Sequence, residues 1–201
     1  DKLSVSDGIR AFVTMSDIET ETLTVEADDN IQAYIETYVI NGEMRLKLKD
    51  HTVIKGRPTI RIYLKASALS AVSGSGGSQT DISNGINSES FRMGLSGGSR
   101  LSARINSGGS VTAEISGGSR SDLSGTCTTL NLHTSGGSRF TGYSFAADMA
   151  DLNASGGSNI ELSVDRKLDV TASGGSNIKY KGSPQIGRRD VTSDSKLTNI
   201  D

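Results

Sequence analysis

Short segments of strictly alternating apolar and polar residues recur along the last two-thirds of the chain. Leu101, Ala103 and Ile105 alternate with Ser102 and Arg104. The same alternation returns at 111–115, 160–164 and 168–172. Period-two alternation is typical of a β-strand with one buried face and one solvated face. The pattern therefore predicts an all-β protein.

The tetrapeptide Ser-Gly-Gly-Ser separates many of these segments and occurs seven times. The copies begin at Ser75, Ser96, Ser107, Ser116, Ser135, Ser155 and Ser173. Six of them recur about every 20 residues, whereas the copy at Ser107 lies half a period out of step and is expected on the opposite side of a coil. A fixed period near 20 residues indicates a repeat architecture in which successive coils stack.

The residue types around the six in-phase copies also keep their register from repeat to repeat. The position directly after each motif is polar, whereas the positions three and five residues before the last five motifs are apolar: Met93, Ala113, Leu132, Leu152 and Val170, and Phe91, Val111, Leu130, Ala150 and Leu168. Such columns are expected where stacked coils share one core. Two adjacent glycines can take positive φ and turn the chain sharply, so we expect Gly174 and Gly175 to resist substitution.

Two other architectures use Gly- and Ser-rich sequence. A flexible linker is excluded by the strict alternation between the motifs. A sandwich or antiparallel barrel would favour Asn-Gly or Asp-Gly hairpins and would not keep a 20-residue register. The sequence therefore predicts a right-handed β-helix, a β-solenoid, whose coils rise by about 4.8 Å, so that the six in-phase corners span roughly 24 Å.

Residues 1–201 are predicted to form a single β-solenoid domain with three parts. Regular coils occupy 73–183, and 184–201 departs from the repeat and suits a terminal cap or a loose tail. Residues 1–72 lack Gly-Gly corners and form either wider first coils or a small antiparallel cap. Strands are predicted there at 9–15, 23–27, 31–37, 44–49 and 60–66, with a hairpin at Asn41-Gly42 and turns at 28–30 and Arg57-Pro58.

Composition and charge narrow the class of protein. Only 34% of the residues are hydrophobic and 4% aromatic, which suits a thin core repeated along an axis rather than one thick core. A net charge of −2 argues against nucleic acid as the main partner. No apolar run approaches the roughly 20 residues of a membrane-spanning helix. The single cysteine, Cys127, has no partner for an internal disulfide and is expected to be a small buried residue.

With its N-terminal β-rich stretch and its Ser-Gly-Gly-Ser corners from Ser75 to Ser176, the chain resembles the putative auto-transporter adhesin, head GIN domain family of bacterial surface-associated proteins. Gly85-Ile86-Asn87 also spells a GIN tripeptide. The resemblance covers nearly the whole chain and implies a β-helical, exported bacterial protein with no catalytic residues to transfer. No signal peptide is visible at Asp1, so we expect that targeting information, including a lipid anchor upstream, has been removed.

The common catalytic and metal-binding patterns are not found in the sequence. The corners lack the aspartate and the period of calcium-binding β-rolls, and His51 and His133 do not have zinc-ligand spacing. No nucleophile elbow or triad order can be recognised among the many serines. The sequence therefore predicts no catalytic residue, no metal site and no cofactor.

Carbohydrate-active β-helix enzymes place paired carboxylates in a groove, so a pair of aspartates on one face would be the candidate catalytic residues of such an enzyme. Asp81 and Asp122 share a column two coils apart, roughly 9–10 Å by the strand spacing, which suits an inverting pair. Asp148 and Asp151 lie on a neighbouring stretch. The simpler interpretation, which we prefer, is a solvated outer face whose charges keep the protein soluble.

One surface feature suggests a binding role. Arg100, Arg120 and Arg139 are predicted to occupy one outward column in successive coils. Stacked like charges are unfavourable unless a neighbour such as Asp122 compensates them, and exposed charges are often only solvated. The alternative is that the column contacts an anionic glycan or a surface protein. Asn159 and Asn177 continue the column and are predicted to form a stacked amide ladder.

The sequence leaves three functions open. The first is a non-enzymatic, exported adhesin or binding module located at the cell surface, at the outer membrane or in the periplasm. The second is a carbohydrate-active β-helix enzyme, against which the even coils between Ser96 and Ser176 count, because they leave no room for long catalytic insertions. The third is a structural envelope scaffold that would associate through the exposed end of the rod.

Overall fold

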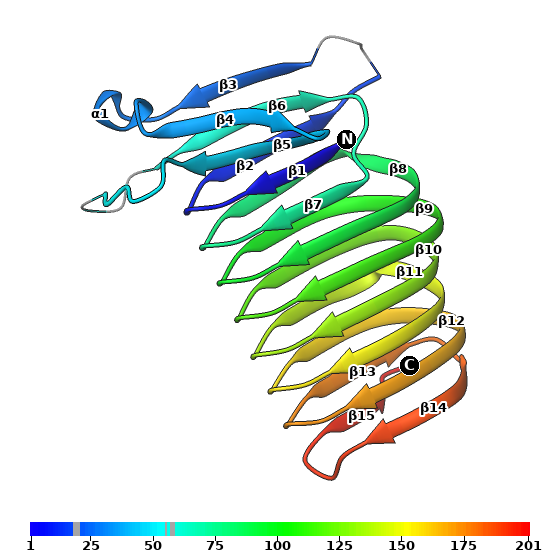
Figure 1. The fold of residues 1–201 in the computed structure, drawn as a ribbon. Coiled ribbons are helices and arrows are strands. Elements are labelled where there is room, and N and C mark those ends of the chain that lie inside the picture. The colour runs from blue at the N-terminus through cyan, green and yellow to red at the C-terminus, as the bar shows by residue number, and fades with distance from the viewer. Residues whose placement is uncertain (18–20, 55, 57–58) are drawn as a thin grey trace.

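The computed structural model describes residues 1–17, 21–54, 56 and 59–201. Its strands join into one 15-stranded sheet that winds into a β-solenoid, so the predicted β-helix is confirmed (Figure 1). The elements are β1 (Lys2–Val5), β2 (Arg10–Met15), β3 (Thr22–Glu26), α1 (Asp29–Gln32), β4 (Ile35–Ile40), β5 (Glu43–Leu48), β6 (Arg61–Ala66), β7 (Ala71–Gly74), β8 (Gln79–Leu95), β9 (Arg100–Ile115), β10 (Arg120–Thr134), β11 (Arg139–Ala154), β12 (Asn159–Ala172), β13 (Asn177–Lys181), β14 (Gln185–Val191) and β15 (Lys196–Asn199).

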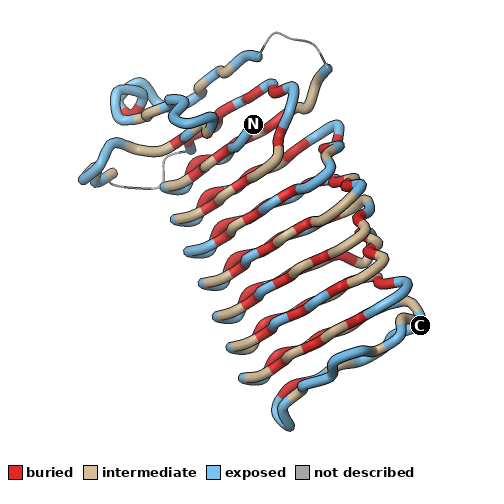
Figure 2. Tube along the Cα trace, turned by 45° about the vertical axis from the view of Figure 1, so that its right-hand side comes forward, coloured by how far each residue is buried: buried red, intermediate tan, exposed pale blue. Residues whose placement is uncertain are grey.

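The long strands β8 to β12 each follow one coil from one corner to the next. Each pairs in parallel with the coil before it and the coil after it, with local register shifts on the side away from the corners. Met93, Ala113 and Leu132 are register partners and are buried, as the column pattern predicts. Along much of β8 to β12, alternate residues therefore point into a narrow shared core, which Figure 2 shows as the repeated buried positions along these coils.

The six in-phase Ser-Gly-Gly-Ser copies form the sharp corners that line one edge of the solenoid (Figure 1). In all six the first glycine has φ between 59° and 66° and the second between 73° and 79°. At the first corner the Ser78 amide donates to the Ser75 carbonyl at 3.1 Å. Two positive φ values closed by this hydrogen bond define a type I′ turn.

The copy at Ser107 is not a turn. It lies inside β9, and its glycines are not among the residues with positive φ. A Cβ on Gly109 would stand 2.7 Å from the Glu89 carbonyl oxygen, so this glycine permits a close approach to the preceding coil. The copy does lie on the side of the coil away from the corners, where Ser107 pairs with Ser88 and Cys127.

The first glycine of each corner also permits the corners to stack. A Cβ on Gly174 would lie 2.8 Å from the Gly156 amide nitrogen, and one on Gly156 would lie 2.9 Å from that of Gly136. Nothing lies within 4 Å of a Cβ placed on Gly175. The two glycines of one corner are therefore required for different reasons: the first for its conformation and its packing, the second for its conformation alone.

The last serine of each corner points into the core, where the two arms of the coil converge. Its relative exposure is at most 1% in all six copies: Ser78, Ser99, Ser119, Ser138, Ser158 and Ser176. Most of these hydroxyls have partners; the Ser138 hydroxyl, for example, donates to the Ser135 carbonyl at 2.6 Å. The Ser78 hydroxyl has none among the described residues. A small side chain is required at this narrow point, and its hydroxyl is satisfied locally in most coils.

The N-terminal third adds two further coils to the solenoid, in an order that differs from the chain order. β1 and β2 lie next to β7 and β8, and they are joined by a corner at residues 6–9. β5 and β6, which come later in the chain, stack on the outer side of β1 and β2. β3 and β4 add antiparallel strands to β6 and β5 at this end.

Four of the five strands predicted in this region match β2, β3, β5 and β6, whereas β1 and β7 were not predicted and the turn predicted at 28–30 is the start of α1. Asn41-Gly42 forms the predicted hairpin turn between β4 and β5, with φ values of 50° and 76°. The predicted strand over 31–37 is wrong at its start, because α1 includes Ile31 and β4 begins only at Ile35. Burial of Ile31 in that helical turn outweighs its β-branched preference for a strand. The turn predicted at Arg57-Pro58 lies outside the described residues.

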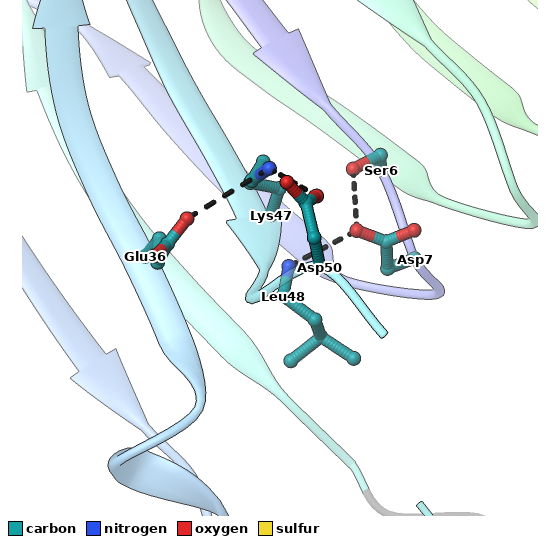
Figure 3. A network of polar contacts seen from close by, with 6 residues as sticks. All are labelled: Ser6, Asp7, Glu36, Lys47, Leu48 and Asp50. Atoms are coloured by element: carbon teal, nitrogen blue, oxygen red, sulfur yellow. Dashed lines mark hydrogen bonds and ion pairs between the residues drawn. The ribbon is translucent and has the colours of Figure 1, made fainter. Parts of the chain in front are cut away.

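A polar network links the outer coil to the corner at residues 6–9 (Figure 3). The Asp7 carboxylate accepts hydrogen bonds from the Ser6 hydroxyl at 2.7 Å and from the Leu48 amide at 3.0 Å. Lys47, beside Leu48, forms ion pairs with Asp50 at 2.6 Å and with Glu36 of β4 at 3.8 Å. Side chains from the corner, β4 and β5 thus hold the terminal coil in place.

The C-terminal segment continues the solenoid as a final coil. β14 pairs with β12, β15 pairs with β13, and residues 192–195 form a corner without glycine in which Ser195 is buried. At the edge, Arg189 stands opposite Val170 of the core column. The exposed charge of Arg189 and the register shift after Ile186 disfavour further pairing at this sheet edge.

We predict that Gly174→Ala lowers the free energy of unfolding by clearly more than Gly175→Ala. Left-handed backbone costs an alanine about 1–2 kcal/mol at either site, but only at Gly174 does the new methyl group also meet the backbone of the neighbouring coil. Urea unfolding followed by circular dichroism measures both values. Equal losses would show that the corners are not in close contact.

A second pair of variants tests the buried serines. Ser138→Ala should lose about 1 kcal/mol of stability, because it removes a hydrogen bond in the core. Ser78→Ala should be neutral or stabilising, since it removes a buried hydroxyl that has no partner among the described residues. Thermal unfolding of the two variants should therefore shift in different directions or by clearly different amounts, and equal destabilisation would contradict the assignment.

Candidate binding surface

The predicted column of arginines is present as a continuous row on the surface. Arg120 is the register partner of Arg100 on one side and of Arg139 on the other. Each is the first residue after a corner, and each is exposed. Adjacent members are separated by about one strand spacing, roughly 4.8 Å. We call Arg100, Arg120 and Arg139 the arginine row.

The guanidinium groups of the arginine row have no protein counter-charge. In the part of the chain that the structure describes, none of the three forms an ion pair or a side-chain hydrogen bond. The pair between Arg120 and Asp122 that the sequence suggested is not formed. Three exposed positive charges therefore stand close together without a direct ion pair to any described acidic side chain, an arrangement that favours an anionic ligand.

The same row of register positions extends in both directions beyond the arginines that the sequence indicated. Arg10 pairs with Gln79, the partner of Arg100, and Lys196 pairs with Asn177 near the other end. Both residues are exposed. The signal was present in the sequence, because Ser-Asp-Gly-Ile-Arg at 6–10 and Thr-Ser-Asp-Ser-Lys at 192–196 are divergent copies of Ser-Gly-Gly-Ser-Arg.

The predicted amide ladder is not formed where it was expected. Asn159 and Asn177 are register partners, but the Asn159 amide donates to the Gly157 carbonyl of its own corner at 3.4 Å. An amide pair occurs instead between Asn106 and Asn87, at 3.1 Å. The first position after a corner is close enough to the turn carbonyls to favour the local bond.

A groove lies beside the arginine row on the same face. Its volume is about 580 Å³, and it crosses β9, β10 and β11. Arg104, Asp122 and Tyr143 line it together with small hydroxyl side chains. Tyr143 is half-buried, and the Lys181 ammonium lies 5.1 Å from the centre of its ring. Burial, with a smaller effect of Glu161, raises the pKa of the Tyr143 phenol, so its hydroxyl stays neutral.

The four aspartates considered for catalysis do not come together. Asp81 and Asp122 share a column with Ser102 between them, as predicted, and Asp81 accepts a hydrogen bond from Gln79 at 2.9 Å. Asp151 lies on the segment that precedes a corner and pairs with Arg188 at 2.7 Å. Asp148 lies 3.9 Å from Arg166. Two of the four carboxylates are thus neutralised by arginines away from the groove.

Metal and nucleophile chemistry finds no support either. No cluster of three or more His, Cys, Asp or Glu side chains suited to a metal ion occurs among the described residues. Cys127 is buried, with a relative exposure of 4%. Burial, with a smaller contribution from the Asp148 carboxylate, raises the pKa of its thiol to about 12. It packs in the core, as expected.

Comparison with known proteins places the chain in a family. Residues 1–184 match the family model described as "Putative auto-transporter adhesin, head GIN domain". The chain belongs to this family. No curated protein matches the sequence of this head GIN domain. Within the described residues, no helix has the length and the apolar character needed to cross a membrane.

Solved structures share the fold of this head GIN domain. A putative adhesin from Bacteroides fragilis superimposes with a TM-score of 0.92 at 21% identity, covering 99% of this chain and 91% of the other. A putative adhesin from Parabacteroides merdae gives 0.75 at 13% identity, covering 100% and 91%. A putative lipid binding protein from Parabacteroides distasonis gives 0.69 at 19% identity, covering 100% and 92%.

The environment of Cys127 leads to a prediction about its reactivity. The thiolate is the nucleophile, so a buried thiol with a pKa of about 12 should not react with a maleimide or with Ellman's reagent at pH 8 in the folded protein. Unfolding in guanidinium should expose one thiol per chain. Rapid labelling of the native protein, measured by intact-mass spectrometry, would contradict the buried position.

Proposed function

We propose that this head GIN domain is a non-enzymatic binding module of the bacterial cell envelope, and that the arginine row is its contact surface for a polyanion. Membership of an adhesin family and the likeness to two proteins named as adhesins support a surface role. We also propose that the protein is exported to the cell surface, the outer membrane or the periplasm, held by a lipid anchor, and that residues 1–201 act as one domain.

The observation that carries this proposal is the absence of counter-charges in the described surroundings of the arginine row. Some other basic residues have acidic partners, such as Arg61 with Glu26 and Lys167 with Asp169. Arg92, which has none among the described residues, stands between neutral register partners, Ala71 and Thr112, and not beside further positive charges. Side chains spaced at about 4.8 Å on a rigid sheet present their charges in a fixed line. A polymer with repeated acidic groups can bind several of them at once, which raises its affinity without any deep pocket.

The two other functions receive less support. For an inverting glycosidase, the pair Asp81 and Asp122 would have to serve as acid and base. Asp81 accepts a hydrogen bond from Gln79, and among the described residues that line the groove Asp122 is the one carboxylate. For a scaffold that grows end to end, both ends would have to offer open strand edges. At one end the outermost strands, β3 and β4, run antiparallel to the coils and do not continue the parallel stacking, and at the other end the exposed Arg189 stands opposite Val170 of the core column.

Replacing the arginine row tests the proposal. A triple variant with Arg100, Arg120 and Arg139 changed to Glu should bind dextran sulfate at least about 10-fold more weakly at low salt, because counterion release contributes most of such affinity. The wild-type affinity should fall as salt rises, and the salt dependence should flatten in the variant. Isothermal calorimetry at several salt concentrations measures both effects.

A matched control variant separates the effect of the arginine row from the effect of net charge. Lys49, Arg92 and Arg189 are exposed and lie off the row, so changing them to Glu gives the same change in net charge. This control should retain most of the wild-type affinity. Equal losses in both triple variants, or no loss in either, would refute the arginine row as the binding surface.

A further inference from the structure

We propose that the groove beside the arginine row is a saccharide subsite, so that the ligand is an acidic polysaccharide. Its acid groups would lie on the arginine row, and the ring hydroxyls of the same chain would lie in the groove. The inference rests on the proposed function for the acid groups and adds a site for the sugar ring itself.

The groove lies close enough to the arginine row for one ligand to contact both. The groove is lined by residues two and four positions after each arginine, such as Asp122 after Arg120 and Tyr143 after Arg139. Alternate residues of a strand point to the same face and lie roughly 7 Å apart. A sugar ring whose acid group reaches the row therefore places its remaining hydroxyls over the groove.

Tyr143 provides a surface on which a ring can stack. It lies in β11 within the register shift between Gly142 and Ala146, and it lines the groove. Lys181, two coils further along, lies over one face of the ring, so a sugar would stack on the other face. The apolar C–H face of a pyranose packs against such an aromatic ring, which is how small polar ligands usually gain apolar contact.

The polar side chains of the groove match the hydroxyl groups of a sugar. Asp122 offers a carboxylate acceptor and Arg104 a guanidinium donor, and neither has a side-chain partner among the described residues. Both are exposed, and the hydroxyls of Ser102, Ser124 and Thr141 lie around them. A sugar hydroxyl donates and accepts at once, so it can satisfy groups of both kinds in one place.

Asp122 also discriminates against simpler polyanions. A polyphosphate carries negative charge along its entire surface and would bring some of it close to the Asp122 carboxylate, where like charges repel. A uronic-acid polymer carries its charge on one side of each ring and neutral hydroxyls elsewhere. It can therefore contact the arginine row with its carboxylates and Asp122 with its hydroxyls, which is the reason for assigning the acidic saccharide class.

The experiment compares three probes by isothermal calorimetry: an oligogalacturonate, neutral maltohexaose and inorganic polyphosphate. Wild-type protein should bind the oligogalacturonate more tightly than polyphosphate and should bind maltohexaose weakly. Tyr143→Ala should weaken oligogalacturonate binding by about 10-fold, as expected when stacking is lost, while leaving polyphosphate binding unchanged. Tyr143→Phe should behave like the wild type, and Tyr38→Ala, on the capping strand β4, is the matched aromatic control.

Asp122→Asn gives a test that does not depend on Tyr143 folding correctly. At high salt, where long-range charge effects are screened, it should weaken the oligogalacturonate several-fold by loss of a charge-assisted hydrogen bond. At low salt it should strengthen polyphosphate binding, because a repulsive charge is removed. A purely structural role for Asp122 would move both affinities in the same direction.

The outcomes separate this inference from the proposed function. If the Arg-to-Glu triple variant loses oligogalacturonate binding but Tyr143→Ala and Asp122→Asn do not, the groove is not a saccharide site and the arginine row still is a polyanion site. The same conclusion holds if the wild type prefers polyphosphate to the oligogalacturonate. If the triple variant binds both anionic probes as well as the wild type does, the proposed function itself is wrong.

Discussion

The solenoid depends on close contact between successive corners. At each corner from Gly97 to Gly174, the first glycine lies against the first glycine of the preceding corner. A Cβ added to it would stand 2.8–3.2 Å from the amide nitrogen of that preceding glycine. The contact requires left-handed backbone and the absence of a side chain together, and glycine alone meets both conditions. Because each of these corners stacks directly on the one before it, the residues that follow the corner have fixed partners in the next coil up to the first register shift.

This fixed register produces both the core and the surface. Inside, it aligns small and apolar residues in columns thin enough to be filled by aliphatic side chains, with three buried phenylalanines at wider points: Phe91, Phe140 and Phe145. Outside, it aligns like with like, so that three arginines stand in a line although their mutual repulsion disfavours it. Arg189 stands at a sheet edge, where a charge disfavours further strand pairing. The arginine row lies within the sheet and protects no edge, so binding of a ligand better explains why its charges are stacked.

The ends of the rod show how a stacked sheet is closed without helices. At one end the chain runs past its first coil, adds another on the outside and covers it with the antiparallel strands β3 and β4 (Figure 1). At the other end a final coil with a glycine-free corner carries Arg189 opposite a core residue. Both ends therefore interrupt the regular parallel stacking of the coils, which favours the faces of the solenoid as its surface for partners.

The sequence by itself determined the regular coils, because alternation and the glycine corners are local features with few alternative structures. It also placed Arg100, Arg120 and Arg139 in one row, since register follows from a constant period. Only the tertiary structure decided that β5 and β6 stack outside β1 and β2, that the segment after Pro184 is another coil, and that Tyr143 and Asp122 share a groove with Arg104. These features arise from pairing between distant segments and from local register shifts, whose energies depend on neighbours in space that no local pattern records.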